Sequence, residues 1–151
     1  MDSVKTVALV AHDNRKADLI EWVDYNASKL ANHHLICTGT TGKLVEKTLK
    51  EKGIIPPSLT KMKSGPLGGD MQLAALASEG KIDILIFLWD PMSAQPHDVD
   101  VKALLRISVL YNVPTACNRA TADFLIDSPH FGTPYQKILK DYSQYINRDI
   151  K

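Results

Sequence analysis

Apolar runs alternate with amphipathic stretches along the chain, and this alternation predicts strands and helices in turn. The run Thr6 to Ala11 is apolar and rich in β-branched residues, with no alternating polar positions, which is typical of a strand covered on both faces. After it, Asp13 can cap a helix that extends to about Lys29 with apolar side chains at helical spacing. The chain therefore opens with a strand and helix suited to a parallel sheet.

The same signals predict further extended segments and helices. The extended segments are Leu35 to Cys37, Leu59 to Met62, Ile82 to Leu88 and Val113 to Cys117. The helices are an amphipathic stretch from Leu44 up to Gly53, Met71 to Glu79, Val101 to Tyr111, Ala120 to Ile126, and Tyr135 to Ile146. The run Ile82 to Leu88 is apolar throughout, so we expect it to be central in the sheet.

Strand and helix alternate about five times without a linker or a repeat period, which predicts a doubly wound, Rossmann-like α/β fold. The sheet is expected to be mainly parallel with helices on both faces, and residues 1–151 are expected to form one domain. Ligands in such folds bind beyond the carboxyl ends of the strands. Polar clusters follow the predicted strands directly: they are His12 with Asp13, the turn at Thr38, the turn at Ser64, Asp90 with His97, and Asn118 with Arg119.

Composition narrows the class of protein. Lys and Arg number 18 against 17 Asp and Glu, a net charge of +1 that argues against a nucleic-acid binder. The N-terminus lacks the pattern of a signal peptide and no apolar run reaches membrane length, so we expect a cytoplasmic protein without a membrane partner. Cys37 and Cys117 lie far apart in apolar stretches and are expected to be reduced, buried thiols.

The turn Thr38 to Gly42, with the sequence TGTTG, offers backbone N–H groups, two glycines and three hydroxyls at the start of a helix. Such a turn suits a phosphate or a carboxylate. An ordinary helix cap is an equally good interpretation of this turn alone. The spacing does not match GxGxxG, which argues against a dinucleotide.

The segment SGPLGGD, from Ser64 to Asp70, is the second candidate cradle. Its glycines let the backbone approach a ligand closely, and Asp70 arrives at a helix N-terminus. Asp70 could simply cap that helix. As a catalytic base it would have a lowered pKa in that position unless burial or neighbouring carboxylates raise it.

The third cluster lies in the loop after the predicted strand Ile82 to Leu88 and in the helix that follows. It contains Asp90, His97, Asp98, Asp100 and Arg106. A histidine oriented by a carboxylate can polarise a carbonyl or transfer a proton, and an exposed loop with Asp98 as a cap is the plainer alternative.

Other histidines and nucleophiles carry less signal. His12 and Lys16 are about one helical turn apart and can face the same ligand, although such pairs are usually solvated. His33, His34 and His130 have no such neighbours and are interpreted as structural. The chain has no cysteine pair and no histidine pair at close helical spacing, so we expect no metal. Ser64 lacks the GxSxG pattern of a nucleophile.

Six strings in register, AHDNRK, TGTTG, SGPLGGD, WDP, QPHDVDVKALLR and NRATADF, make the chain resemble the methylglyoxal synthase family over almost its whole length. The resemblance implies conversion of dihydroxyacetone phosphate to methylglyoxal and inorganic phosphate. It also implies that no metal or organic cofactor is used, that the chain forms a homo-oligomer, typically a homohexamer, and that phosphate acts as product and inhibitor.

The resemblance also implies residue roles. Asp70 would remove a carbon-bound proton and His97 would contact the substrate oxygens. The implied substrate and phosphate contacts are His12, Lys16, Thr38, Gly39, Thr40, Thr41, Ser64 and Gly65, and the implied supporting carboxylates are Asp13, Asp90 and Asp100. Arg106 and Arg148 are candidates for a phosphate or inter-subunit contact, outside the catalytic set.

The residues alone leave two other functions possible. The same fold, by resemblance, serves as the allosteric domain of carbamoyl phosphate synthetase, which binds a phosphorylated ligand without turnover. A sugar-phosphate isomerase would use the same enediolate chemistry. The joint presence of Asp70, Asp90, His97 and Asp100 favours an enzyme over a sensor, whereas only the product distinguishes the synthase from an isomerase.

Overall fold

The computed structural model describes residues 1–149 and contains one five-stranded sheet in which every neighbouring pair is parallel. The strand order is β3-β2-β1-β4-β5. The strands are β1 (Thr6–Ala11), β2 (His34–Cys37), β3 (Ser58–Lys61), β4 (Ile84–Leu88) and β5 (Thr115–Ala116). The prediction of a doubly wound α/β fold is confirmed, and β4 pairs on both sides as expected for an interior strand.

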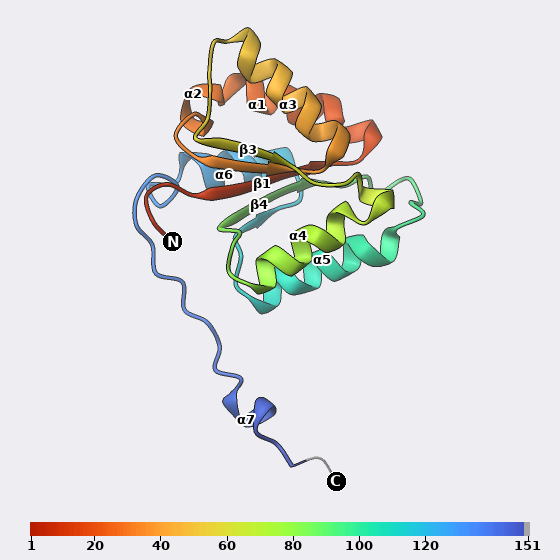
Figure 1. Cartoon of the computed structure of the whole chain (residues 1–151), viewed down its shortest axis with the longest axis vertical. Helices are drawn as coiled ribbons and strands as arrows, with labels where there is room; N and C mark the ends of the chain where they lie inside the picture. The colour runs from red at the N-terminus through yellow and green to blue at the C-terminus, as the bar shows by residue number, and fades with distance from the viewer. Residues whose placement is uncertain (150–151) are drawn as a thin grey trace.

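Helices cover both faces of this sheet (Figure 1). The α-helices are α1 (Lys16–Tyr25), α2 (Ala27–Leu30), α3 (Gly39–Glu51), α4 (Gly69–Ser78), α5 (Asp98–Leu110), α6 (Arg119–Asp127) and α7 (Ser143–Ile146), and the short 3-10 helices are η1 (Asp13–Arg15) and η2 (Gly65–Leu67). One apolar core joins α1, α2, α3 and α6 to the sheet, and a second core joins α4 and α5 to the opposite face.

The strand β1 shows why its sequence has no polar alternation. Val7 and Leu9 belong to the core on the α1 side, whereas Ala8 and Val10 belong to the core on the α4 side. All four side chains are at most 2% exposed. Because successive strand side chains point to opposite faces, a strand with helices on both sides must be apolar at every position.

The predicted helix from Asp13 to about Lys29 is interrupted twice. It begins as the 3-10 helix η1, and Asp13 makes no capping hydrogen bond because its carboxylate accepts from Lys16 Nζ. It breaks again at Asn26, whose side-chain amide donates to the Trp22 carbonyl at 2.9 Å. A side chain that bonds the backbone carbonyl of the preceding turn competes with regular helix geometry.

The predicted helix from Tyr135 to Ile146 is wrong over most of its length, since only Ser143–Ile146 is helical. The C-terminal segment, residues 132–149, is bonded to the body at Thr133 and Tyr135 and beyond them extends away from it (Figure 1), and Ile138 is 84% exposed. An amphipathic pattern forms a stable helix mainly when its apolar face packs on something. Within residues 1–149 this segment meets the body mainly at the end of α5, and most of its apolar side chains stay exposed.

Boundaries of other elements differ by a few residues. The strand expected from Val113 to Cys117 is only Thr115–Ala116, and the strand expected from Ile82 begins at Ile84. The helix expected from Val101 begins at Asp98, so Asp98 and Asp100 lie in its first turn. Within the described chain, no helix is long and apolar enough to cross a membrane.

Of the three histidines interpreted as structural, His33 is buried, whereas His34 and His130 are exposed. His33 is buried and its Nδ1 accepts the Lys5 backbone N–H at 3.0 Å. Cys37 is buried, and this burial raises the pKa of its thiol to about 12. Cys117 is only half-buried, which corrects the expectation that both thiols are buried. Both cysteines are unpaired thiols.

Candidate active site

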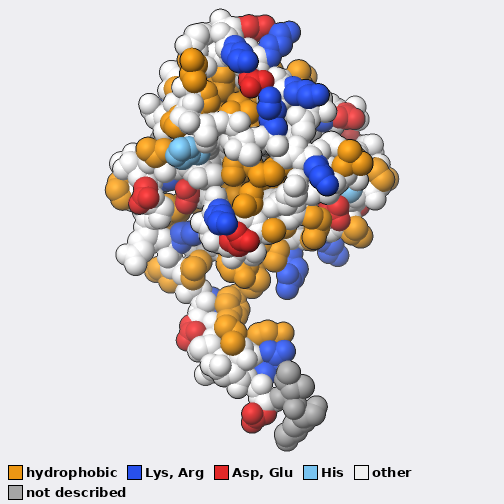
Figure 2. All heavy atoms as spheres, viewed as in Figure 1, with side chains coloured by type: hydrophobic (Ala, Val, Ile, Leu, Met, Phe, Trp, Pro, Cys, Tyr) orange, Lys and Arg blue, Asp and Glu red, His pale blue; other side chains and the backbone are white. Residues whose placement is uncertain are grey.

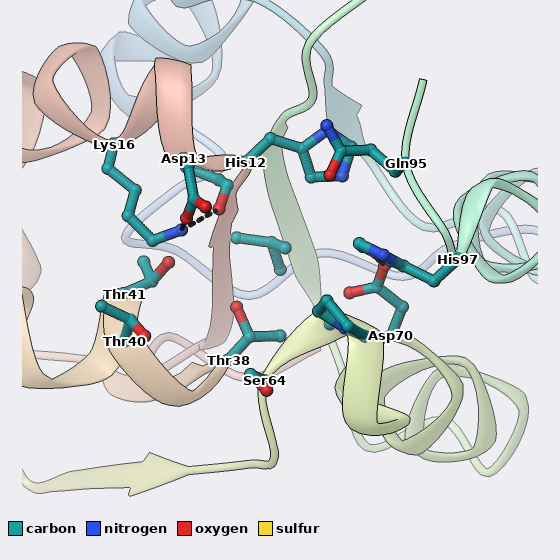
Figure 3. Close-up of a pocket in the computed structure, with 14 residues that line it drawn as sticks. His12, Asp13, Lys16, Thr38, Thr40, Thr41, Ser64, Asp70, Gln95 and His97 are labelled. Carbon is teal, nitrogen blue, oxygen red and sulfur yellow. Dashed lines mark hydrogen bonds and ion pairs between the residues drawn. The ribbon is translucent and has the colours of Figure 1, made fainter. Parts of the chain in front are cut away.

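A cavity of about 200 Å³ opens at the carboxyl ends of the strands, beside β1 (Figure 3). β1 lies between β2 and β4, the point where the strand order changes direction and where ligands bind in doubly wound sheets. The lining residues are Val10, Ala11, His12, Asp13, Lys16, Thr38, Thr40, Thr41, Ser64, Gly65, Pro66, Asp70, Gln95 and His97. The structure thus brings together the polar clusters that follow the first four strands.

One wall of the cavity is suited to an anion. The residues of the TGTTG string after Thr38 form the first turn of α3 and not a separate turn, and Thr40 and Thr41 of this turn line the cavity at the helix N-terminus, whereas the Gly39 N–H donates to the Lys63 carbonyl at 3.2 Å. Thr41 Oγ1 is buried and has no hydrogen-bond partner among residues 1–149. Gly39 packs against the other cradle, because a Cβ there would lie 3.0 Å from the Ser64 nitrogen. Gly39 itself does not line the cavity.

Lys16 supplies the positive charge at this wall. Its ammonium donates to the Ala11 carbonyl at 3.1 Å and to Asp13 Oδ1 at 2.6 Å, as the dashed lines in Figure 3 show. The hydrogen bond from Lys16 lowers the pKa of Asp13, whose side chain is otherwise almost fully exposed. Lys16 is therefore paired, beside the cavity, with an exposed carboxylate that a bound anion can replace.

Asp70 lies in the first turn of α4 but does not cap it. The N-cap position is Gly68, and no side-chain capping bond is made. The Asp70 residue is 0% exposed, and neither carboxylate oxygen has a hydrogen-bond partner in the described chain. Burial raises the pKa of Asp70; nearby His97 partly opposes this, and Asp100 adds to it. The interpretation of Asp70 as a cap is therefore wrong.

Burial of an uncompensated carboxylate is unfavourable for folding, so it marks a group kept for another purpose. Gly69 makes the placement possible, because a Cβ at this position would collide with the Lys63 carbonyl oxygen. The Gly69 N–H donates to the Ser64 carbonyl at 3.0 Å. Together these contacts fix the start of α4 against the second cradle and hold Asp70 at the cavity.

His97 faces Asp70 across the cavity. Its Nε2 lies 3.6 Å from Asp70 Oδ2, and the ring is 6% exposed. This distance allows an ion pair when the ring is protonated but is too long for a hydrogen bond. Gly65 packs directly on the ring, because a Cβ there would lie 2.7 Å from Nε2.

His12 forms the third polar group of this wall. Its Nδ1 accepts the backbone N–H of Asp90 at 2.9 Å, and its ring packs edge-on against His97 with centroids 5.4 Å apart. Burial lowers the pKa of His12, and the nearby His97 and Lys16 lower it further. His12 is therefore a neutral imidazole at neutral pH.

The histidines also bear on the question of a metal. His12, Asp70 and His97 each place one potential ligand atom within 4.8 Å of the others, a cluster that their separation in the sequence concealed. His12 fits a metal poorly, however, because Nδ1 already accepts an N–H and the neutral ring must carry its proton on Nε2. That proton would have to move to Nδ1, against the Asp90 N–H, before the metal could bind.

The three carboxylates expected to form a supporting network are not joined to one another by any hydrogen bond in the described chain. Asp13 pairs with Lys16, whereas Asp90 accepts from the Asn14 side chain and from the Met92 N–H, both at 2.9 Å. The hydrogen bond from Asn14 lowers the pKa of Asp90. Asp100 is half-buried in the first turn of α5.

Some residues lie elsewhere than expected or had escaped notice. Arg106 lines a hollow between α5 and the C-terminal segment, away from the cavity, and Arg148 stacks 3.6 Å above the Tyr145 ring. Gln95 and Asn14 were not predicted as part of the site, although Gln95 lines it. Their sequence signals were a position after a strand, which many inert polar residues share, and membership of the strings AHDNRK and QPHDVDVKALLR.

An anion-suited helix start, a lysine, a buried carboxylate and two imidazoles around one small cavity define an α/β enzyme of the phosphate-binding, acid–base class. Comparison with known proteins specifies this class further. Residues 18–117 match the family model described as MGS-like domain. A relative in Maridesulfovibrio salexigens named methylglyoxal synthase is 55% identical over 99% of this chain and 100% of its own length.

Two further matches agree. A methylglyoxal synthase of Leptospira interrogans serogroup Icterohaemorrhagiae serovar copenhageni is 53% identical over 97% of this chain and 95% of its own. The crystal structure of methylglyoxal synthase from Elizabethkingia anophelis NUHP1 superimposes with a TM-score of 0.89 at 50% identity, covering 100% of this chain and 95% of that one. The chain belongs to the methylglyoxal synthase family, and its activity is the lyase activity of that family.

Proposed function

We propose that the cavity binds dihydroxyacetone phosphate and that Asp70 is the base that starts its conversion to methylglyoxal and inorganic phosphate. The observation that carries this proposal is the buried Asp70 carboxylate, without a hydrogen-bond partner among the described residues and 3.6 Å from His97. A carboxylate with a pKa raised by burial is a stronger base than an exposed one.

The reaction follows from these groups in three steps. Asp70 removes a proton from the hydroxymethyl carbon, and the electrons move onto the carbonyl oxygen, which takes a proton from His97 to give an enediol. The terminal hydroxyl of the enediol then returns a proton to His97 as its oxygen becomes the aldehyde, the carbon–carbon double bond shifts to the next pair of carbons, and the bridging C–O bond breaks so that phosphate leaves. The remaining 2-hydroxypropenal takes a proton from Asp70 on its terminal carbon, gives its hydroxyl proton to the departing phosphate and becomes methylglyoxal. Charge develops on oxygen mainly in the transition state, where a fixed donor is most effective.

The phosphate is proposed to lie against the start of α3 and the second cradle, next to Lys16. The proposed contacts are His12, Lys16, Thr38, Gly39, Thr40, Thr41, Ser64 and Gly65. Gly39 would act through its backbone and through the close approach of the two cradles. Asp13, Asp90 and Asp100 would support the site individually, through Lys16, the loop after β4 and Asp70 respectively.

Product analysis tests this function directly. We expect purified protein incubated with dihydroxyacetone phosphate, without added metal, to form methylglyoxal and inorganic phosphate in equal amounts, and we expect added phosphate to compete with substrate. Binding without either product would point to a phosphate-ligand sensor. Glyceraldehyde 3-phosphate as the only product would point to an isomerase.

The proposed partner is a further copy of this chain in a homohexamer, with a location in the cytoplasm and residues 1–151 acting as one domain. Support comes from the C-terminal segment, where apolar side chains lie along the extension below the body (Figure 2). Ile138 is 84% exposed and Ile146 is 74% exposed. Isolated apolar side chains on a projecting segment gain stability mainly by packing on another surface.

Light scattering on the purified chain is expected to give six times the monomer mass. Ile138→Lys should shift this mass toward smaller species, because a charge would be buried at the contact while the monomer loses little packing. Ile55→Lys, at a side chain that is 89% exposed elsewhere, is the matched control. A monomer in the unmodified protein, or assembly unaffected by Ile138→Lys, would contradict the proposed role of this segment.

A further inference from the structure

The ring of His12 is fixed between the ends of two strands. His12 directly follows β1, and its backbone N–H donates to the Leu88 carbonyl at 3.2 Å, which extends the contact between β1 and β4 by one residue. The ring packs edge-on against Phe87 with centroids 5.5 Å apart, and the residue is 6% exposed. These contacts leave the imidazole little freedom to rotate.

One hydrogen bond determines where the His12 proton lies. The Asp90 backbone N–H donates to Nδ1 at 2.9 Å. A backbone N–H can only donate, so Nδ1 must offer its lone pair and a neutral ring must carry its single proton on Nε2. Nε2 is buried and has no hydrogen-bond partner in the part of the chain that the structure describes. His12 also lines the cavity, so this N–H is a donor without a protein acceptor at the cavity wall.

The Asp90 peptide is itself held by two bonds to its own side chain. Asp90 Oδ1 accepts the Met92 N–H at 2.9 Å, and Oδ2 accepts from Asn14 Nδ2 at 2.9 Å. Asn14 lies in η1, two residues after His12. The loops after β1 and β4 are therefore joined in both directions, from Asn14 to the Asp90 carboxylate and from the Asp90 N–H back to His12.

We propose that Asn14 is a positioning residue that acts through Asp90 to fix His12 as the tautomer protonated on Nε2, so that the cavity presents a neutral N–H donor to a ligand oxygen. The tautomer follows from the hydrogen bonds alone. The use of this donor to stabilise the enediolate oxygen rests on the proposed function. His12 and His97 then have different roles, since His12 keeps its proton while His97 is placed to exchange one with the reacting groups.

The charges around His12 support a neutral ring. His97 and Lys16 disfavour a positive charge there, whereas Asp90 and Asp98 favour it, and burial acts with the first pair to lower the pKa of His12. Asp70 also faces this cluster. An imidazolium would in addition place a proton on Nδ1 against the Asp90 N–H. A neutral donor is useful here because it stabilises a developing oxyanion without protonating the Asp70 base.

Nuclear magnetic resonance on the full chain labelled with ¹⁵N-histidine tests the tautomer. We expect the His12 signals, identified by their loss in His12→Gln, to show an unprotonated Nδ1 and a protonated Nε2 at pH 7 to 8. In Asn14→Ala, we expect signals averaged between the two tautomers and a His12 pKa moved up toward its ordinary value. Turnover should fall about tenfold with KM unchanged, less than the loss on removing an oxyanion donor itself.

Asn32→Ala, which removes an exposed side-chain amide elsewhere, is the control and should change neither the ¹⁵N signals nor the rate. Asn14→Asp provides a second variant, because a carboxylate cannot donate to Asp90 and should shift the signals in the same direction as Asn14→Ala. A His12 protonated on Nδ1 in the unmodified protein would overturn the proposal. So would Asn14 variants that lower only the melting temperature and leave the ¹⁵N signals unchanged.

The ¹⁵N signals do not depend on turnover, so the two proposals can fail separately. The expected tautomer in a protein that forms no methylglyoxal would contradict the proposed function and leave the positioning role of Asn14 intact. Methylglyoxal formation by a protein with the opposite tautomer would contradict the positioning role of Asn14 and leave the proposed function intact.

Discussion

Asp70→Asn is expected to lower turnover of dihydroxyacetone phosphate by about 10²- to 10⁴-fold, the range that a positioned general base contributes. An amide has no basic lone pair for the carbon-bound proton, and no other carboxylate lines the cavity within residues 1–149 except Asp13, which is paired with Lys16. Inorganic phosphate binding should be nearly unchanged, because the proposed phosphate contacts belong mainly to the start of α3 and to the second cradle. Steady-state kinetics and phosphate titration measure the two effects separately.

Glu79→Gln is the matched control, since Glu79 is an exposed acid at the opposite end of α4 from Asp70. It should keep turnover within about twofold, as is usual for surface substitutions. Near-normal turnover in Asp70→Asn would remove Asp70 as the base. A parallel loss of phosphate binding in that variant would instead indicate that the cavity had been disrupted.

Asp70→Asn is also expected to be more stable than the unmodified protein at neutral pH. Burial raises the folded-state pKa of Asp70 above its unfolded value, so the unfolded state loses its proton first as the pH rises. Stability attributable to Asp70 is therefore present below the unfolded pKa and is lost as the pH rises through the folded pKa. Thermal unfolding at several pH values should show the difference between the two proteins growing across that interval.

Gly65→Ala is expected to lower turnover by about 10²-fold, the loss that a misplacement of about 1 Å can cause. The added Cβ would lie 2.7 Å from His97 Nε2, closer than atoms can pack, so the ring must move from its place beside Asp70. The substitution adds no charge and removes no polar side chain, so the loss would report geometry. It is measured by kcat together with a titration of the His97 signals.

Gly132→Ala is the control, because a Cβ at Gly132 meets nothing within 4 Å and the backbone there is not in the left-handed region. It should leave kcat unchanged. If His97 acts only through its ring position, Gly65→Ala combined with His97→Asn should be little worse than His97→Asn alone, since both changes affect one interaction. Full activity of Gly65→Ala would show that the His97 position is unimportant.

Much of the candidate site could be anticipated from the sequence because a parallel sheet imposes a simple rule. Polar residues that follow successive strands must meet at one edge, and His12, the Thr38 string, the Ser64 cradle and His97 all line one cavity. The rule does not predict which side chains contact one another. It suggested a network of Asp13, Asp90 and Asp100, whereas these carboxylates contact Lys16, Asn14 and the backbone around Met92, and Asp100 only faces Asp70 at a distance.

The C-terminal segment shows a different limit. Its apolar spacing predicted a helix from Tyr135 to Ile146, and the structure has one turn of helix in an extended segment. Periodicity reports which side of a helix would be apolar, but the helix forms only if that side is covered. Which surface is available is a property of the folded protein and not of the segment.

The sequence by itself determined the type and order of the elements, the parallel α/β fold, the family and the set of polar residues near the strand ends. Tertiary structure alone decided that Asp70 is buried without a hydrogen-bond partner in the described chain, that His97 lies 3.6 Å from it and that Asp90 sets the His12 tautomer. Local periodicity determines which face of an element is buried. The pKa and protonation state of a side chain depend on desolvation and donors supplied by segments far away in the sequence.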